Sequence, residues 1–132
     1  MAHGPGRAVG FAVLLGLSAT AGEAQTTLYD DARACADPAL DPDDFVREEV
    51  TTLTEEGMFT IEYSCVFGEP IAFDWSHGEP IVRAGYCMEP GPYVYPTVFV
   101  VGLWPGEDGV ARVWQQGAEP AGEAVVFEVC GE

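Results

Sequence analysis

Short runs in which every second residue is hydrophobic fill the second half of the chain and restrict it to β structure. In residues 58–67 the hydrophobic positions alternate with Thr60, Glu62 and Ser64, a period of two that is typical of a half-buried strand. Further runs follow at residues 71–75, 81–87, 97–104, 109–115 and 123–130, with Gly and Pro between them. This spacing predicts an all-β fold, a small antiparallel sandwich or barrel of about six to seven strands.

The phrase Gly-Glu-Pro-Ile occurs twice, at residues 68–71 and 78–81. Each copy stands where one expected strand ends and the next begins. There Gly can take a positive φ, and Pro fixes its own φ and lacks a donor. As a catalytic pair, Glu69 and Glu79 would lie about 20 Å apart across the intervening strand, farther than paired glycosidase carboxylates. We therefore interpret the repeat as turn chemistry.

The first 24 residues have the pattern of an export signal. Arg7 precedes an apolar run at residues 9–17, and small residues suited to a signal peptidase follow. The run is shorter than the about 20 apolar residues that span a bilayer. We therefore expect residues 1–24 to be removed and the mature chain to be periplasmic or secreted, without membrane insertion. Residues 25–132 are then one domain, an acidic N-terminal arm (25–57) followed by an antiparallel core (58–132).

The arm contains two competing patterns. Asp41 as N-cap and Pro42 at the first helical position favour a short helix. The β-branched residues of 46–54 favour a strand, and Gly57 suits a hairpin after it. Residues 45–54 stay open between helix and strand, and we expect a short helical turn followed by a strand.

Four cysteines follow the expected cleavage site and predict two disulfides, since an even number is typical of small exported domains. They are Cys35, Cys65, Cys87 and Cys130. Three connectivities are open. If residues 71–75 form a strand, it separates Cys65 from Cys87 by about 9 to 10 Å, beyond the usual reach of a disulfide. The pattern therefore favours Cys35 with Cys65 and Cys87 with Cys130.

The formal net charge of −17 restricts the classes of partner. An acidic surface is either simply solvated or produces a field that attracts a basic protein. The charge disfavours nucleic acid and anionic membranes as partners, because both require clustered Lys and Arg. The oligomeric state is left open, because charge and composition do not determine it.

No cofactor and no metal site are predicted. The acidic residues of the arm would suit calcium, but their spacing lacks the glycine and the distal Glu of an EF-hand loop. They are Asp37, Asp41, Asp43 and Asp44. A solvated acidic arm with a helix cap explains them better.

Catalytic side chains are scarce after the signal segment. His77 is the one remaining histidine, and Ser64 and Ser76 are the only serines. Neighbours on a strand or turn point in different directions, so Asp74, Ser76 and His77 do not form a triad by being close in sequence. We predict no catalytic residues and no enzyme.

The segment "MEPGPYVYP" is the most unusual part of the chain, because three prolines stiffen it around two tyrosines. Large rings on a rigid loop give contact area at low entropic cost. Tyr93 and Tyr95, with Trp75 and His77 beside them, are therefore the candidate binding residues. The alternative is that these tyrosines cover the open end of the core.

The stretch "YSCVFG" resembles, in a general way, the small periplasmic lysozyme inhibitors through its Tyr, Cys and Gly. No other residue of such an inhibitor is recognisable, and no family is assigned on this basis. We expect a non-enzymatic binding or inhibitory module of the cell envelope with a cationic protein partner. The alternatives are a structural envelope protein without a ligand, a calcium-binding domain or an enzyme.

Overall fold

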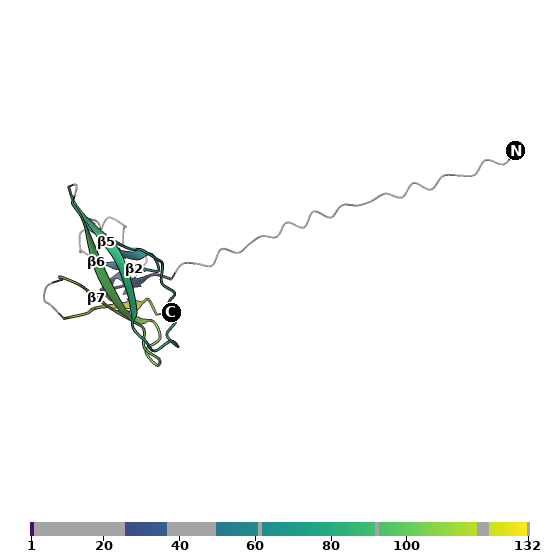
Figure 1. Ribbon diagram of the computed structural model, residues 1–132. Helices are drawn as coiled ribbons and strands as arrows, with labels where there is room; N and C mark the ends of the chain where they lie inside the picture. The colour runs from purple at the N-terminus through teal and green to yellow at the C-terminus, as the bar shows by residue number, and fades with distance from the viewer. Residues whose placement is uncertain (2–25, 37–49, 61, 92, 119–121, 132) are drawn as a thin grey trace.

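The computed structural model describes residue 1 and residues 26–36, 50–60, 62–91, 93–118 and 122–131. Within these residues the chain forms a closed barrel of eight antiparallel strands in sequence order, and β1 pairs with β8 to close it (Figure 1). The elements are β1 (Leu28–Tyr29), α1 (Arg33–Ala36), β2 (Thr52–Thr54), β3 (Gly57–Phe59), β4 (Ser64–Phe67), β5 (Ile81–Glu89), β6 (Tyr93–Gly102), β7 (Val110–Gln115) and β8 (Val125–Val129). The all-β prediction is confirmed, and the up-and-down barrel is the form it takes.

The arm supplies two strands of the barrel. Leu28 on β1 and Leu53 on β2 are fully buried in the core. The expected hairpin at Gly57 is confirmed, since β2 and β3 pair across a turn at Glu55 and Glu56. A Cβ on Gly57 would lie 1.9 Å from the carbonyl oxygen of Cys65, so the close approach of β4 requires glycine here. The signal segment, the helical turn at 41–44 and the acidic cluster of the arm lie outside the described residues.

The single strand expected at residues 58–67 is wrong. The chain reverses there and forms two strands, β3 and β4. Thr60 makes the turn, because its amide donates to the carbonyl of Tyr63 at 2.7 Å and its hydroxyl accepts from the amide of Tyr63 at 2.9 Å. The reversal also shifts which residues of the alternating pattern point inward, so that Met58 faces the core and Phe59 is only partly buried.

The strand expected at residues 71–75 is also wrong, because this segment belongs to a loop that covers one end of the barrel. Ile71 is buried, and its amide donates to the carbonyl of Glu55 at 2.9 Å. Phe73 and Trp75 stack with ring centroids 5.9 Å apart and pack against the core. The Trp75 indole N–H donates to the carbonyl of Val110 at 2.8 Å. The alternating apolar residues therefore seal the barrel end without forming a strand.

The predicted disulfide pairing is wrong for the same reason. With no strand between them, β4 and β5 pair directly, and Cys65 lies opposite Cys87 with Cα atoms 4.0 Å apart. The two are bonded to each other inside the core. Cys35 is bonded to Cys130, with Cα atoms 5.1 Å apart, and ties the segment after β1 to the end of β8. Both disulfides support an oxidising environment for the folded chain.

The core consists of the inward-facing residues of all eight strands and of Ile71 and Leu103. Phe67 and Phe99 meet edge to face at its centre, with ring centroids 5.1 Å apart. The two Gly-Glu-Pro-Ile copies stand at the two ends of the loop between β4 and β5, so each adjoins a strand on one side only and not on both, as the sequence predicted. The second copy uses its glycine at a positive φ of 72° at Gly78.

Candidate functional site

The four predicted binding residues do not form one site. Tyr93 lies at the tip of the β5–β6 hairpin and is 67% exposed. Tyr95 is partly buried and packs against the core. Trp75 and His77 belong to the loop before β5, and the nine residues of β5 separate them from the tip by roughly 26 Å. Trp75 packs against the core, whereas His77 is exposed.

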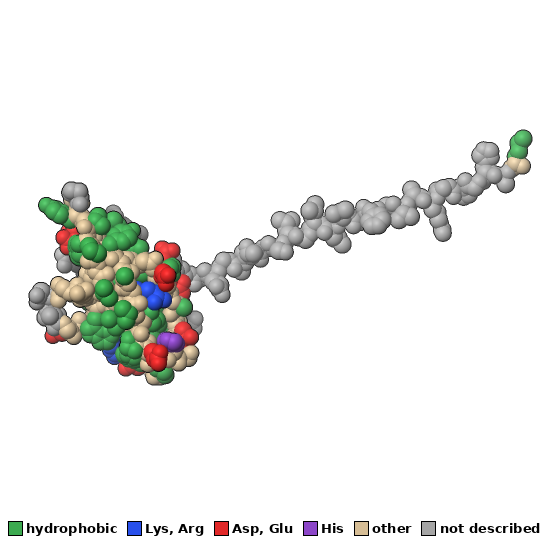
Figure 2. Space-filling model, in the orientation of Figure 1, with side chains coloured by type: hydrophobic (Ala, Val, Ile, Leu, Met, Phe, Trp, Pro, Cys, Tyr) green, Lys and Arg blue, Asp and Glu red, His purple; other side chains and the backbone are tan. Residues whose placement is uncertain are grey.

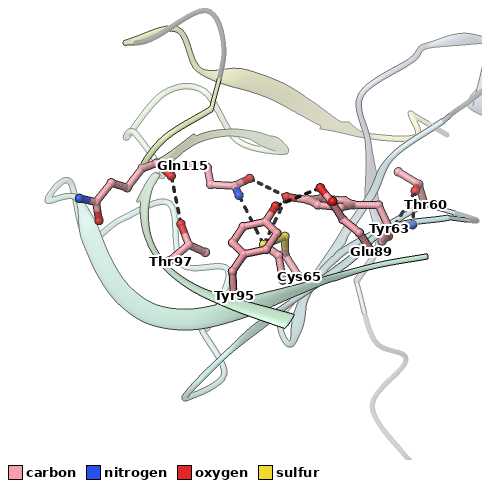
Figure 3. Close-up of a disulfide and its surroundings, with 9 residues drawn as sticks. Thr60, Tyr63, Cys65, Glu89, Tyr95, Thr97 and Gln115 are labelled. Atoms are coloured by element: carbon pink, nitrogen blue, oxygen red, sulfur yellow. Dashed lines mark hydrogen bonds between the residues drawn. A yellow bond between two sulfur atoms is a disulfide. The ribbon is translucent and has the colours of Figure 1, made fainter. Parts of the chain in front are cut away.

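A polar cluster lies under the tip of the hairpin, next to the Cys65–Cys87 disulfide (Figure 3). The Tyr63 hydroxyl donates to Gln115 Oε1 at 2.9 Å, and Gln115 Nε2 donates to Cys87 Sγ at 3.4 Å. The Tyr95 hydroxyl donates to Glu89 Oε1 at 3.4 Å. The Tyr63 hydroxyl and then burial raise the pKa of Tyr95 to about 12.

These contacts give the polar cluster a structural role. The hydroxyls of Tyr63 and Tyr95 are both engaged in hydrogen bonds with neighbouring side chains. The cluster links β4, β5, β6 and β7 across the barrel interior. Of the two tyrosines proposed from the sequence to cover the open end of the core, Tyr95 packs against the core, whereas Tyr93 is exposed.

The outward-facing side of the β5–β6 hairpin is apolar along its length. Four register pairs point outward, because side chains alternate along each strand and the intervening positions face the core. We call the eight residues of these pairs the apolar face: Val82 with Val100, Ala84 with Val98, Tyr86 with Pro96, and Met88 with Val94. Its most exposed members are Val94 at 62% and Val82 at 58%. Monomeric proteins rarely expose a contiguous apolar patch of this kind unless it is a binding site.

Neighbouring strands extend this surface. Val66 on β4 pairs with Tyr86, and Trp114 on β7 pairs with Val100. Beside Trp114 a cavity of about 350 Å³ opens between β6, β7 and the segment after β7. Val98, Val100 and Trp114 line it together with Glu123. The cavity is thus an apolar groove at the margin of the face with one carboxylate on its wall.

Charge is placed around the apolar face rather than on it. Glu79 precedes β5 and Glu89 ends it. Further acidic residues stand beside the ends of the neighbouring strands β4 and β7, and they are Glu62, Glu69, Glu107 and Asp108. Arg112 on β7 is neutralised by Glu107, whose Oε1 accepts from its Nη2 at 3.3 Å. Figure 2 shows hydrophobic side chains gathered on this side of the molecule, with acidic and also basic side chains beside them. The face is therefore an uncharged strip in an acidic surround.

The hairpin projects beyond the rest of the barrel (Figure 1). Strand β7 pairs only with Phe99–Gly102 of β6, so residues 93–97 have no strand on that side in the described part of the chain. The Val98 carbonyl accepts from the amide of Gln116, which places the backbone groups of Val94 and Pro96 on the same open edge. Pro96 has no N–H to offer there, and prolines are typical of edges that resist strand addition. Contact with a partner would therefore be made through side chains.

Sequence reasoning missed the apolar face, although a signal for it was present. The run "TVFVVG" is apolar at both phases of the alternation, whereas a strand with one solvated side has polar residues at every second position. The odd-numbered residues of β6 fill the interior of the barrel, so the side chains of its even-numbered residues must point outward.

Within the described ranges, no group of three or more His, Cys, Asp or Glu side chains could hold a metal ion. The same residues include no helix long and apolar enough to cross a membrane. Comparison with known proteins gives no significant match to a protein family, a curated protein or a solved structure.

Proposed function

We propose that this protein is an exported, non-enzymatic binding module of the cell envelope that docks a basic protein on its apolar face. The observation that carries the proposal is the absence of any charged side chain from the four outward register pairs of β5 and β6, in a chain with a net charge of −17. The export signal and the two disulfides support a periplasmic or secreted location.

The arrangement matches the anatomy of a protein interface. An apolar centre supplies most of the binding free energy by excluding water, and aromatic residues are the frequent anchors. Here Tyr86 lies within the face, Tyr93 stands at its tip and Trp114 borders the groove. The acidic surround would steer a cationic protein to the face and speed its association at low salt.

The sign of the charge selects the kind of partner. A second copy of this chain would bring another −17, and the like charges around the two faces would oppose their approach. A basic protein with an apolar patch has no such penalty. Its Lys or Arg side chains would also suit the groove, where the aliphatic stem can pack on Trp114 while the charged head lies near Glu123.

The proposal is tested by capture followed by a direct affinity measurement. The mature chain is used to capture proteins from an envelope extract of its own source, and each retained protein is purified and titrated by calorimetry. The Met88→Glu/Val94→Glu double variant puts charge on one register pair, and it should bind at least about 30-fold more weakly, the effect of losing about 2 kcal/mol at an interface centre.

Val126→Glu is the matched control, because Val126 is a similarly exposed strand residue on β8, away from the hairpin. It should bind as the parent does. Failure to retain any basic protein would favour the structural alternative, and self-association of the chain through the same face would replace the basic partner by a second copy. Equal affinities for the double variant and the control would remove the apolar face from the proposal.

A further inference from the structure

A second cavity lies on the other side of β5, where the sheet is incomplete. The pairing of β4 with β5 ends at Phe67 and Gly85, and the Gly68 amide then donates to the carbonyl of Ala84 at 2.8 Å. Before that point β5 runs beside the loop of residues 70–80, and no ladder joins the two among the described residues. A cavity of about 380 Å³ opens between them, within the size range of small-molecule sites.

Arg83 forms one wall of this cavity. It belongs to the inward-facing set of β5 and pairs with Phe99 of the core. Its Nη1 donates to the carbonyl of Val82 at 3.1 Å, while its Nε is buried and has no hydrogen-bond partner. No acidic side chain in the described part of the chain forms an ion pair with it. Arg83 as a whole is partly exposed, so the unmet requirement is the buried Nε donor, which an oxygen of a bound ligand would satisfy.

The lining of the cavity also includes a second donor and an apolar surface. His77 lines the cavity from the loop, and its ring offers an N–H in either protonation state. Pro80 and Ile81 line the apolar side. Asp74 is the one carboxylate on the wall, and its Oδ1 already accepts from the amide of Ser76 at 2.9 Å and from the Ser76 hydroxyl. Hydrogen bonds from the Ser76 hydroxyl and then from its amide hold the pKa of Asp74 below its usual value.

We infer that this cavity binds a small organic carboxylate. The carboxylate accepts from the Arg83 guanidinium and the His77 imidazole, a pairing that charge-assisted hydrogen bonds make strong, and the apolar body of the ligand rests on Pro80 and Ile81. The net charge of −17 repels anions in general, so an anion that binds here does so through this local pair of donors. The inference does not rest on the docking of a basic protein.

Sodium acetate is the probe, titrated at constant ionic strength against sodium chloride while the Arg83 Nε–H and His77 ring signals are followed by NMR. Acetate should give a saturable shift of both signals, and chloride should not. His77→Ala, a change at an exposed residue, should weaken acetate binding about tenfold, the effect of losing one charge-assisted hydrogen bond. Arg83→Gln should abolish saturation.

Arg112→Gln is the matched control, because it removes the same charge from an arginine that is paired with Glu107 outside the cavity. It should leave the acetate affinity unchanged. The inference is overturned if acetate and chloride give the same linear shift, or if Arg112→Gln weakens binding as much as Arg83→Gln. If Arg83→Gln does not fold, His77→Ala decides alone, and an unchanged acetate affinity in that variant overturns the inference.

Discussion

Single glycine residues allow the strands of this barrel to approach closely. Gly85 pairs with Phe67, and a Cβ at Gly85 would lie 2.2 Å from the carbonyl oxygen of Val66 and 3.0 Å from the ring of Phe99. The edge-to-face contact of Phe67 with Phe99 therefore depends on the empty space over Gly85. No pattern in the sequence marks this glycine as different from those in the turns, because the requirement comes from two strands that are distant in sequence.

Gly85→Ala should lower the free energy of unfolding by about 1 to 3 kcal/mol, since the methyl group must displace backbone or the Phe99 ring. Gly131→Ala is the control, because nothing lies within 4 Å of a Cβ there. Urea denaturation of both variants and of the parent measures the difference. A Gly85→Ala protein as stable as the Gly131→Ala protein would show that β4 and β5 do not approach as described.

Tyr95 should make the fold sensitive to alkaline pH. The Tyr63 hydroxyl and burial raise its pKa from 10.0 to about 12, so the folded state favours the neutral phenol. The stabilisation is complete below pH 10 and is lost as the pH rises from 10 towards 12, because the unfolded chain ionises first. The stability difference between the parent and Tyr95→Phe should therefore shrink between pH 9 and pH 11.5 in urea denaturation. A difference that stays constant over this range would contradict the assignment.

At the scale of elements, the two sides of the β5–β6 hairpin have different roles. Its inward-facing residues fill the core and hold the Cys65–Cys87 disulfide, and its outward-facing residues form the apolar face. Residues 93–97 of β6 have no strand partner on one side among the described residues, and Pro96 lacks the backbone N–H donor on that edge. The hairpin can therefore present apolar side chains to a partner while its backbone resists pairing with other copies.

Pro96→Val should make the protein self-associate, because it restores an N–H on the open edge beside a strand rich in β-branched residues. Sedimentation velocity across a range of concentrations should show a larger weight-average mass than for the parent. The Val126→Glu control should sediment as the parent does. Identical profiles for Pro96→Val and the parent would mean that the edge is protected by something other than this proline.

At the scale of the whole molecule, the sequence predicted the class of fold and the strands of its C-terminal half. Runs at 81–87, 97–104, 109–115 and 123–130 correspond to β5 to β8, because long alternating segments bounded by Gly and Pro leave few alternatives. The two-residue strand β1 has no periodicity to detect. It is a strand because β2 and β8 lie on either side of it, and this requirement exists only once the barrel closes.

The candidate site was less accessible to sequence analysis than the fold. The loop expected around Tyr93 and Tyr95 is much shorter than predicted, because β5 extends to Glu89 and β6 begins at Tyr93. Tyr93 is exposed, whereas Tyr95 packs against the core. Trp75 and His77 lie far from Tyr93, and the predicted strand at residues 71–75, which is a loop in the structure, led to the wrong disulfide pairing. The apolar face was not identified from the sequence, because the alternating pattern shows only that one side of each strand is apolar. Which apolar residues point outward becomes clear only when the core residues are known.

The two disulfides should differ in what they contribute to stability. Cys35–Cys130 spans 95 residues and Cys65–Cys87 spans 22. In the chain-entropy account the longer loop contributes about 4 to 5 kcal/mol and the shorter about 3 kcal/mol. The Cys35→Ser/Cys130→Ser variant should therefore lose about 4 to 5 kcal/mol in urea denaturation, a large share of the stability of a small domain. A loss of less than about 1 kcal/mol would show that the β1–β8 closure holds without this bridge.

The docking of a basic protein on the apolar face is tested most directly by methyl NMR of the mature chain with its purified, captured partner. The valine methyl groups of Val82, Val94, Val98 and Val100 should shift or broaden on addition of the partner, because they lie on the face. Those of Val126 and Val129, which are also exposed but lie on β8, should not change. Perturbation of the β8 valines with an unchanged β5–β6 set would contradict the account.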